Sequence, residues 1–121
     1  MASKGQSNQY GNSRGTPTKH INYKYAKDFN KNTISIHFKE HGKEFGAVSK
    51  DDYIAKAIKF ANSIDRKKNE SFIDKNGSTY KYQEQTNRFE IIDKNGIIIT
   101  FFKPKDGREY YEKQKKLKER E

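Results

Sequence analysis

Two histidines, His37 and His41, stand four residues apart in the segment HFKEHGKEFG. If this segment is helical, their Cβ atoms lie about 5–6 Å apart on one face of the helix. Imidazole titrates near neutral pH, so one ring could act as a general base and the other as a general acid. The same spacing fits two polar structural residues equally well. A metal site would need a third ligand, such as His20 or a carboxylate, and no recognised zinc spacing is present.

A second group of candidate residues lies in the segment ITFFKPKDGREYY. Thr100 places a hydroxyl in an otherwise apolar run, either as an ordinary strand residue or as a phosphate ligand on the open face of a sheet. Lys103 precedes Pro104 at the strand end, where a cation could stabilise the charge that builds up on a phosphorane. Tyr110 and Tyr111 fit packing residues, platforms for base stacking, or hydroxyl donors to a phosphate.

Two further cations could contact phosphate. Lys39 lies between the two histidines, and Arg88 lies in a strand-like run. An arginine can bind phosphate through two parallel hydrogen bonds. Exposed lysines and strand arginines are also common on surfaces that bind nothing, so these two residues are candidates for substrate binding only.

Together, these residue types match what RNA cleavage without a cofactor requires. That reaction needs a base for the 2′-OH proton, an acid for the leaving 5′-oxygen, and a cation or hydroxyl for the phosphoryl oxygens. The same set suits DNA poorly, because DNA lacks the 2′-OH. The chain has no cysteine, which excludes thiol nucleophiles, thiolate metal sites and disulfides. It also has no P-loop and no glycine-rich dinucleotide turn.

Composition points to one small domain with an anionic partner. The 121 residues carry 26 Lys and Arg against 16 Asp and Glu, a formal net charge of +10. Such an excess favours RNA, DNA or an acidic protein as the partner, although a lysine-rich composition also serves solubility. Eight Tyr and eight Phe supply enough apolar bulk for a core. No apolar run is long enough to span a membrane.

The clearest predicted helix runs from Ser49 to about Ile64. Ser49 can cap its N-terminus, and two aspartates follow in the first turn, where they suit the helix dipole. An apolar stripe then recurs at spacings of three and four residues. It consists of Tyr53, Ile54, Ala57, Ile58, Ala61 and Ile64.

After this helix the apolar period changes to two, which predicts strands over 71–75, 78–83, 88–93 and 96–103. Two Asn-Gly pairs, Asn76-Gly77 and Asn95-Gly96, are typical of two-residue hairpin turns. Strict alternation on the last strand would place Ile98, Thr100 and Phe102 on one face and Ile97, Ile99 and Phe101 on the other.

The order of these elements predicts an α+β fold, with N-terminal helices packed on a four-stranded antiparallel β-meander and a short C-terminal helix. Residues 1–17 are rich in Gly, Ser, Asn and Gln and are expected to form a flexible linker or lead-in. Residues 18–121 are then a single domain. The first 32 residues hold six cations and one aspartate, and are expected to form a basic arm that either contacts phosphates or is a solvated tether.

The order of motifs resembles a known family of toxin domains. The motifs are HFKEHGKEFG, SKDDYIAKAIKFANS, KNGSTYKYQEQTNRFEIIDKNGIIITFFKP and EYY, and together they cover about residues 33–111. They resemble C-terminal toxin domains of large bacterial effectors, including contact-dependent inhibition, phage-like and LXG-type polymorphic toxins. This family belongs to the barnase/EndoU/colicin/RelE-like ribonuclease superfamily.

The resemblance implies a metal-independent ribonuclease, often directed at tRNA, that gives a 2′,3′-cyclic phosphate and is neutralised by a cognate immunity protein. It implies no cofactor, partners limited to RNA and an acidic immunity protein, and a monomer without a membrane segment. Delivery would be as part of a larger secreted or surface-bound effector that acts in the target-cell cytoplasm. The alternative is a non-catalytic basic RNA-binding module or a phage-related interaction domain.

Carried over by motif, the resemblance gives a candidate site. The Thr86-Asn87 step is expected to shape a turn. The expected catalytic residues are His37, His41, Thr100, Lys103 and Tyr111, and Tyr110 is expected to bind substrate. Lys39 and Arg88, which are candidates from their residue types and not from the resemblance, complete the expected substrate-binding residues.

Overall fold

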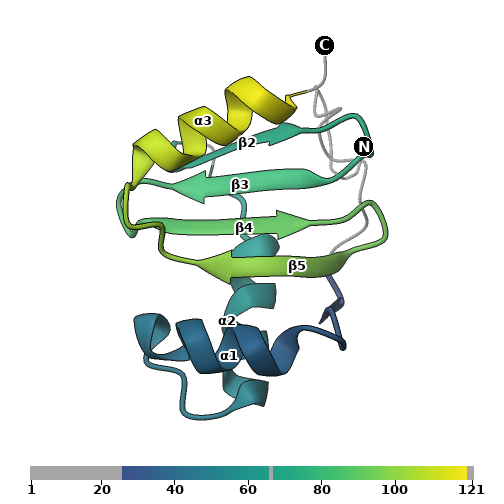
Figure 1. Ribbon diagram of the computed structural model, residues 1–121, viewed down its shortest axis with the longest axis vertical. Helices are drawn as coiled ribbons and strands as arrows, with labels where there is room; N and C mark the ends of the chain where they lie inside the picture. The colour runs from purple at the N-terminus through teal and green to yellow at the C-terminus, as the bar shows by residue number, and fades with distance from the viewer. Residues whose placement is uncertain (1–25, 66, 120–121) are drawn as a thin grey trace.

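A computed structural model describes residues 26–65 and 67–119. The predicted lead-in at residues 1–17, most of the basic arm and His20 lie outside the described residues. The described part is an α+β fold in which helices flank one sheet, as expected (Figure 1).

The sheet has five strands in the order β1-β5-β4-β3-β2. They are β1 (Asp28–Phe29), β2 (Asn69–Ile73), β3 (Thr79–Gln83), β4 (Arg88–Ile92) and β5 (Ile97–Phe102). The last four strands form the predicted antiparallel meander. Strand β1 adds to it in parallel with β5, so the sheet is mixed. The sequence analysis missed β1, because two residues are too few to show an alternating pattern.

The two hairpin turns are longer than the Asn-Gly pairs predict. Both have the sequence DKNG, and in each the aspartate carboxylate accepts backbone N–H groups from within the turn. Only the glycines, Gly77 and Gly96, have positive φ, at 86° and 85°. A two-residue type I′ turn would need positive φ at the asparagine as well. The aspartate therefore helps to define these turns, which the prediction of two-residue loops overlooked.

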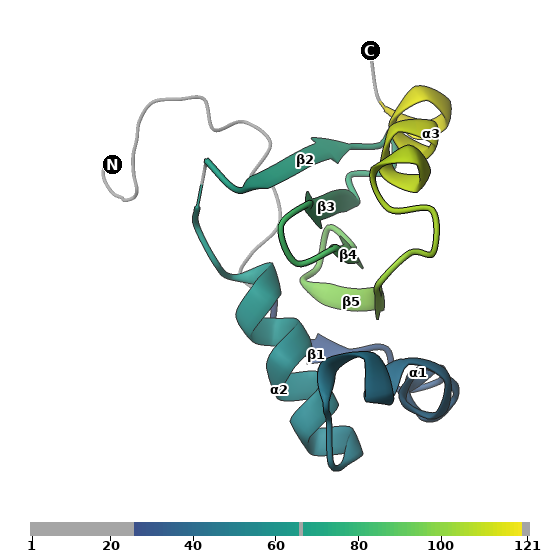
Figure 2. The same ribbon diagram turned by 90° about the vertical axis from the view of Figure 1, so that its left-hand side faces the viewer.

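The described helices are α1 (Ile34–His41), the 3₁₀ helix η2 (Gly42–Phe45), α2 (Lys50–Ala61) and α3 (Arg108–Lys118). In Figure 2, α2 lies on one side of the sheet, and α3 lies on the other side along β2 and β3. Helix α1 lies beyond β5, at the opposite end of the sheet from α3 (Figure 2). Within the described part of the chain, no helix is both long and apolar enough to cross a bilayer.

Helix α2 begins as predicted and ends earlier. The Ser49 hydroxyl accepts the N–H of Asp52 at 3.0 Å, which satisfies one of the free donors of the first turn. The helix ends at Ala61, so Ile64 falls outside the helical period and is 74% exposed. Phe60 is buried instead, although the predicted stripe omitted it.

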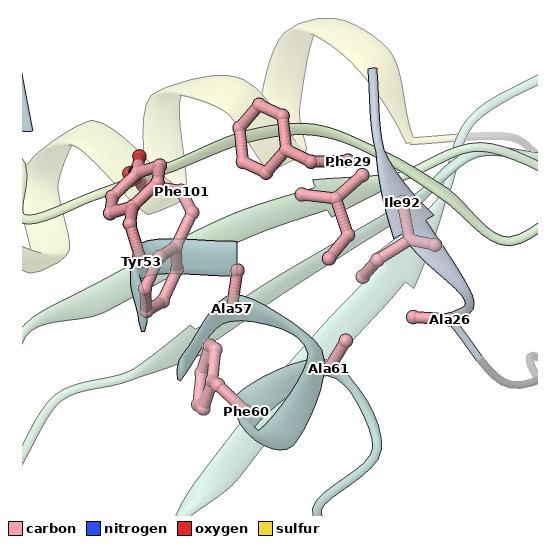
Figure 3. Close-up of a cluster of buried hydrophobic side chains, with 9 residues drawn as sticks. Ala26, Phe29, Tyr53, Ala57, Phe60, Ala61, Ile92 and Phe101 are labelled. Carbon is pink, nitrogen blue, oxygen red and sulfur yellow. Dashed lines mark hydrogen bonds between the residues drawn. The ribbon is translucent and has the colours of Figure 1, made fainter. Parts of the chain in front are cut away.

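The first core lies between α2 and strands β1, β4 and β5 (Figure 3). The Phe45 ring of η2 stacks on Phe101 at 4.0 Å between ring centroids, which ties η2 to this core. The buried members are Ala26, Phe29, Tyr53, Ala57, Phe60, Ala61, Ile92, Ile98 and Phe101.

A bulge in β5 decides which side chains face this core. Ile91 pairs with Thr100 and Ile92 pairs with Ile98, so Ile99 is an extra residue in the ladder. Ile98 therefore shares the first core with Phe101. The predicted strict alternation, which placed Ile98 on the Thr100 face, is wrong because a bulge shifts the period by one residue.

The second core lies under α3 on the opposite face of the sheet. Phe102 packs against it, and the register that joins Thr100 to Ile91 and Tyr80 puts Thr100 on this same face. Its buried members are Phe72, Tyr80, Tyr82, Phe89 and Tyr111.

Candidate active site

The structure brings His37, His41 and Thr100 together where α1 meets β5. The segment HFKEH is helical, and the ring centroids of His37 and His41 lie 5.9 Å apart. The Thr100 Oγ1 lies 3.4 Å from Nδ1 of His37, although 63 residues separate them in sequence. The four-residue spacing thus does place both imidazoles on the helix face that meets the strand threonine.

The environment of His37 favours its neutral form. Partial burial lowers its pKa most, the neighbouring His41 lowers it further, and Glu40 opposes both effects. A neutral imidazole carries a lone pair on one nitrogen. His37 is therefore suited to accept a proton at neutral pH.

A row of aromatic rings extends from His41 along the sheet toward α3. The His41 ring lies 5.2 Å from Phe102, and Tyr110 contacts Phe102 edge-on at 5.5 Å. Tyr110 also meets Phe89 edge-on at 5.1 Å. Burial raises the pKa of Tyr110, so its hydroxyl stays protonated at neutral pH and can donate a hydrogen bond. Of the two tyrosines predicted for the site, Tyr110 is the one beside it.

Tyr111 belongs to the second core. Its ring stacks on Tyr82 at 5.2 Å and contacts Phe72 at 5.6 Å, and the residue is only 1% exposed. A side chain with this burial cannot reach a substrate. The predicted catalytic role of Tyr111 does not fit the structure, because successive helical residues point in directions about 100° apart.

Lys103 reaches the site through its backbone. Its N–H donates to Oε1 of Glu44 at 2.7 Å. Its ammonium group lies 5.6 Å from the centroid of the Phe45 ring. The ammonium group that was predicted to face the phosphate thus lies beside η2. Lys103 is linked to His41 through its backbone N–H, by way of Glu44.

Glu44 is the site residue that the sequence analysis missed. Its Oε2 lies 2.7 Å from Nδ1 of His41, while its Oε1 accepts the Lys103 N–H. A second carboxylate, on Glu40, lies 3.8 Å from Nε2 of His41 and is 62% exposed. The sequence signal for Glu44 is its position three residues after His41. This spacing puts the two side chains on one face only if the chain remains helical beyond Gly42.

Gly42 allows the chain to continue from α1 into η2. A Cβ atom at this position would lie 2.8 Å from two atoms of the Phe38 ring, closer than real Cβ contacts. Gly46 then ends η2 with a φ of 66°, a left-handed conformation that favours glycine. The two glycines of HFKEHGKEFG therefore build the turn that returns Glu44 to His41.

The two predicted phosphate ligands lie in different parts of the fold. Lys39 is exposed on α1. The Arg88 guanidinium lies over the Phe60 ring at 4.4 Å and donates to Gln83 and Thr86. Because Phe60 belongs to the core under α2, Arg88 is on the opposite face of the sheet from Thr100.

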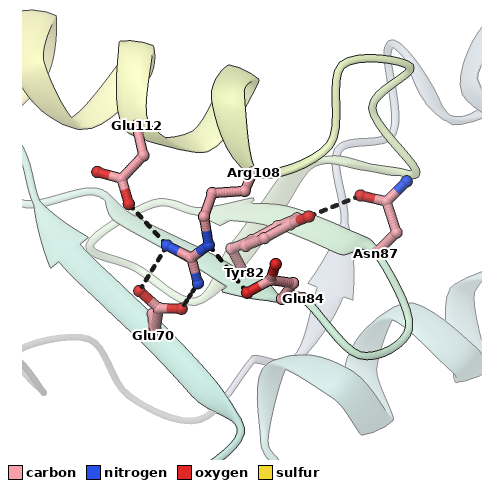
Figure 4. Close-up of polar contacts among 6 residues, drawn as sticks. All are labelled: Glu70, Tyr82, Glu84, Asn87, Arg108 and Glu112. Carbon is pink, nitrogen blue, oxygen red and sulfur yellow. Dashed lines mark hydrogen bonds and ion pairs between the residues drawn. The ribbon is translucent and has the colours of Figure 1, made fainter.

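The start of α3, which carries Tyr110, is fixed by a polar network (Figure 4). Arg108 pairs with the carboxylates of Glu70, Glu84 and Glu112. The Asn87 side chain accepts from the Tyr82 hydroxyl at 2.8 Å and donates to the Pro104 carbonyl at 2.9 Å. Asn87 has a φ of 56°, so the Thr86-Asn87 step shapes a turn as expected.

Metal ligation finds no support in the described residues, where no group of three or more His, Asp or Glu side chains is placed to hold an ion. His20, the third ligand considered from the sequence, lies outside this part of the chain. The site combines two imidazoles, a hydroxyl and a carboxylate bound to one imidazole. Its two rings, 5.9 Å apart between centroids, are suited to transfer protons at two separate points.

No protein-family model matches the chain, and no curated protein is significantly similar to it.

Proposed function

We propose that this protein is a toxin-type endoribonuclease that cleaves RNA by attack of the 2′-OH on the adjacent phosphorus. The observation that carries this proposal is the convergence of His37, His41 and Thr100 on one face of the sheet. The motif resemblance to effector toxin domains supports it independently of the geometry. The net charge of +10 suits a polyanionic substrate.

Each part of the site has a role in this reaction. The two imidazoles remove the 2′-OH proton and supply a proton to the leaving 5′-oxygen. The Thr100 hydroxyl donates to a non-bridging phosphoryl oxygen as its charge develops. The Phe102 and Tyr110 rings offer an apolar surface on which a base next to the scissile bond stacks. The products are a 2′,3′-cyclic phosphate and a 5′-hydroxyl end.

The motif resemblance adds the biological setting to this proposal. The substrate is tRNA, the domain is delivered by a larger effector into the cytoplasm of a target cell, and an acidic immunity protein neutralises it. The revised set of candidate residues is His37, His41, Thr100 and Tyr110. Tyr111 and the Arg88 side chain are left out, since one is buried and the other lies on the far face.

The test is cleavage of purified tRNA by the purified protein in buffer with EDTA, followed by mapping of the new ends. We expect discrete products with 2′,3′-cyclic phosphate ends, and losses of about 10²-fold or more in His37→Ala and His41→Ala. Lys116→Ala, an exposed change on α3 far from the histidines in the fold, serves as the control variant and should cleave normally.

A second control is made in the substrate. RNA with a 2′-O-methyl group on the nucleotide that supplies the attacking hydroxyl should stay intact at the mapped site. Cleavage of that RNA would overturn 2′-OH attack. Intact tRNA at high enzyme excess would overturn the nuclease proposal, and salt-sensitive binding without turnover would support the non-catalytic RNA-binding module.

A further inference from the structure

We propose that Glu44 is a positioning residue that makes His41 the proton donor of the site and leaves His37 as the proton acceptor. This inference rests on the proposed ribonuclease function and assigns roles that the sequence leaves open. Glu44 does not face the substrate. It acts through the ring of His41.

A hydrogen bond joins the side chains of Glu44 and His41. Glu44 Oε2 lies 2.7 Å from Nδ1 of His41. An ionised carboxylate only accepts hydrogen bonds, so Nδ1 must carry the hydrogen. The ring is therefore held with Nε2 as its outer nitrogen, the atom available to exchange a proton with a substrate.

The Glu44 side chain is itself held in place. Its other oxygen accepts the Lys103 N–H at 2.7 Å, at the end of β5. The Phe45 ring next to it in the chain stacks on Phe101 in the first core. A carboxylate with both oxygens engaged and a packed neighbour leaves the imidazole of His41 little freedom to turn.

The two imidazoles have different neighbours. Nδ1 of His37 faces the Thr100 hydroxyl at 3.4 Å, and no carboxylate among the described residues is hydrogen-bonded to this ring. Burial and the neighbouring His41 lower the pKa of His37. Cleavage needs one proton acceptor and one proton donor, and the other imidazole, His41, is held by Glu44 with Nε2 facing outward. The asymmetry thus separates a donor from an acceptor.

The charged and titratable groups around the pair are few. On α1 and η2 they are Glu40, with a carboxylate 3.8 Å from Nε2 of His41, and Glu44. Directly after β5 comes Lys103, whose ammonium lies over Phe45. From α3 comes Tyr110, which is separated from His41 by the Phe102 ring. Among the charged groups of residues 26–65 and 67–119, only the Glu44 carboxylate is within hydrogen-bond distance of an imidazole.

These roles give a balanced reaction. His37 takes the proton of the 2′-OH, and the 2′-oxygen forms a bond to phosphorus. The bond from phosphorus to the 5′-oxygen breaks, and that oxygen takes the proton from Nε2 of His41. Glu44 accepts the Nδ1 hydrogen bond throughout and gains no proton.

One experiment measures directly which ring nitrogen of His41 carries the hydrogen. Side-chain ¹⁵N–¹H NMR of labelled protein reports which ring nitrogen of each histidine carries hydrogen. We expect neutral His41 to carry it on Nδ1 in the wild type and to lose that preference in Glu44→Ala. Glu40→Ala is the matched control, because that carboxylate is near the same ring without a hydrogen bond. A preference unchanged in Glu44→Ala would overturn the positioning role.

A second experiment separates donor from acceptor. A substrate with a bridging 5′-sulfur has a leaving group that needs no protonation. His41→Ala and Glu44→Ala should therefore regain activity on it relative to the 5′-oxygen substrate, while His37→Ala should not. On the ordinary substrate Glu44→Ala should lose at least about tenfold in kcat/KM, and Glu44→Gln, which keeps an acceptor oxygen, should lose less.

The outcomes keep the two proposals apart. Rescue of His37→Ala in place of His41→Ala would reverse the roles and overturn this inference, and so would full activity of Glu44→Ala in a cleaving enzyme. A wild-type protein with His41 held by Glu44 that cleaves no RNA would overturn the ribonuclease function, while leaving the positioning of His41 by Glu44 in place.

Discussion

At the scale of single residues, Thr100 is a candidate site residue because its hydroxyl faces the His37 imidazole. A threonine in the apolar run IIITFF is ordinary for a strand. In the structure its hydroxyl lies 3.4 Å from His37 and its face of the sheet continues into the Phe102 and Tyr110 rings. The bulge at Ile99 leaves this hydroxyl on the α3 face while Ile98 and Phe101 fill the core under α2.

Thr100→Val should lower kcat/KM for RNA cleavage by about 10- to 150-fold, the range expected for loss of one hydrogen bond to a charged group. The change is nearly isosteric, so stability should fall little. Thr79→Val is the matched control, since Thr79 is buried on β3 and its Oγ1 makes no hydrogen bond. Equal rates in the two variants, measured on the same tRNA, would contradict a role for the Thr100 hydroxyl.

At the scale of elements, the junction of α1 and η2 is the part that builds the site. Helix α1 supplies both imidazoles, and the 3₁₀ turn returns Glu44 to the second of them. The junction passes through Gly42, which packs directly under the Phe38 ring. Small changes there should therefore affect both stability and the orientation of His41.

Gly42→Ala should destabilise the protein by up to about 2 kcal/mol. The clash with Phe38 costs about 1–3 kcal/mol, and alanine recovers about 1 kcal/mol over glycine in a helical conformation. Urea denaturation measures the change in the free energy of unfolding. Repeating the substitution in a Phe38→Leu background should make it less costly, because the smaller side chain leaves room, and an equal cost in both backgrounds would show that the clash is not the cause.

At the scale of the whole molecule, the sheet separates two cores, and the one under α2 holds buried charge. Lys81 donates to the carbonyls of Phe60, Ala61 and Ser63 at the C-terminal end of α2, and burial lowers its pKa to about 8. Glu90 lies opposite Lys81 in the register of β3 and β4. It is fully buried, and its carboxyl oxygens make no hydrogen bond.

The free energy of unfolding should therefore fall as pH rises from the pKa of Glu90 in the unfolded chain to its raised pKa in the native protein. Burial raises the pKa of Glu90 well above its usual value, an effect that Lys81 and Arg88 oppose. Above about pH 4.3 the unfolded chain has released this proton while the native protein keeps it, so the free energy of unfolding falls by up to about 1.4 kcal/mol per pH unit until the native group ionises. Above that point the loss is constant.

Glu90→Gln removes this titration. We expect it to match the wild type near pH 4 and to be more stable at pH 7, as measured by urea denaturation at both values. Glu109→Gln, at an exposed position on α3, is the control and should change neither measurement. A Glu90→Gln protein that is less stable than the wild type at pH 7 would contradict a native state that keeps Glu90 protonated.

The sequence by itself determined the elements whose signals are local. The Ser49 cap, the four strands of the meander and the turn at Asn87 follow from residue types within a few positions of each other. The four-residue spacing of His37 and His41 likewise placed both rings on one helix face.

Only the tertiary structure decided which of these residues meet. Strand β1, the bulge at Ile99 and the burial of Tyr111 depend on contacts between distant segments, which no local period encodes. The same holds for Glu44: its carboxylate reaches His41 because Gly42 permits a tight turn, and it stays there because the Lys103 N–H, 59 residues away, holds its other oxygen. The sequence supplied the reactive groups, and packing selected their partners.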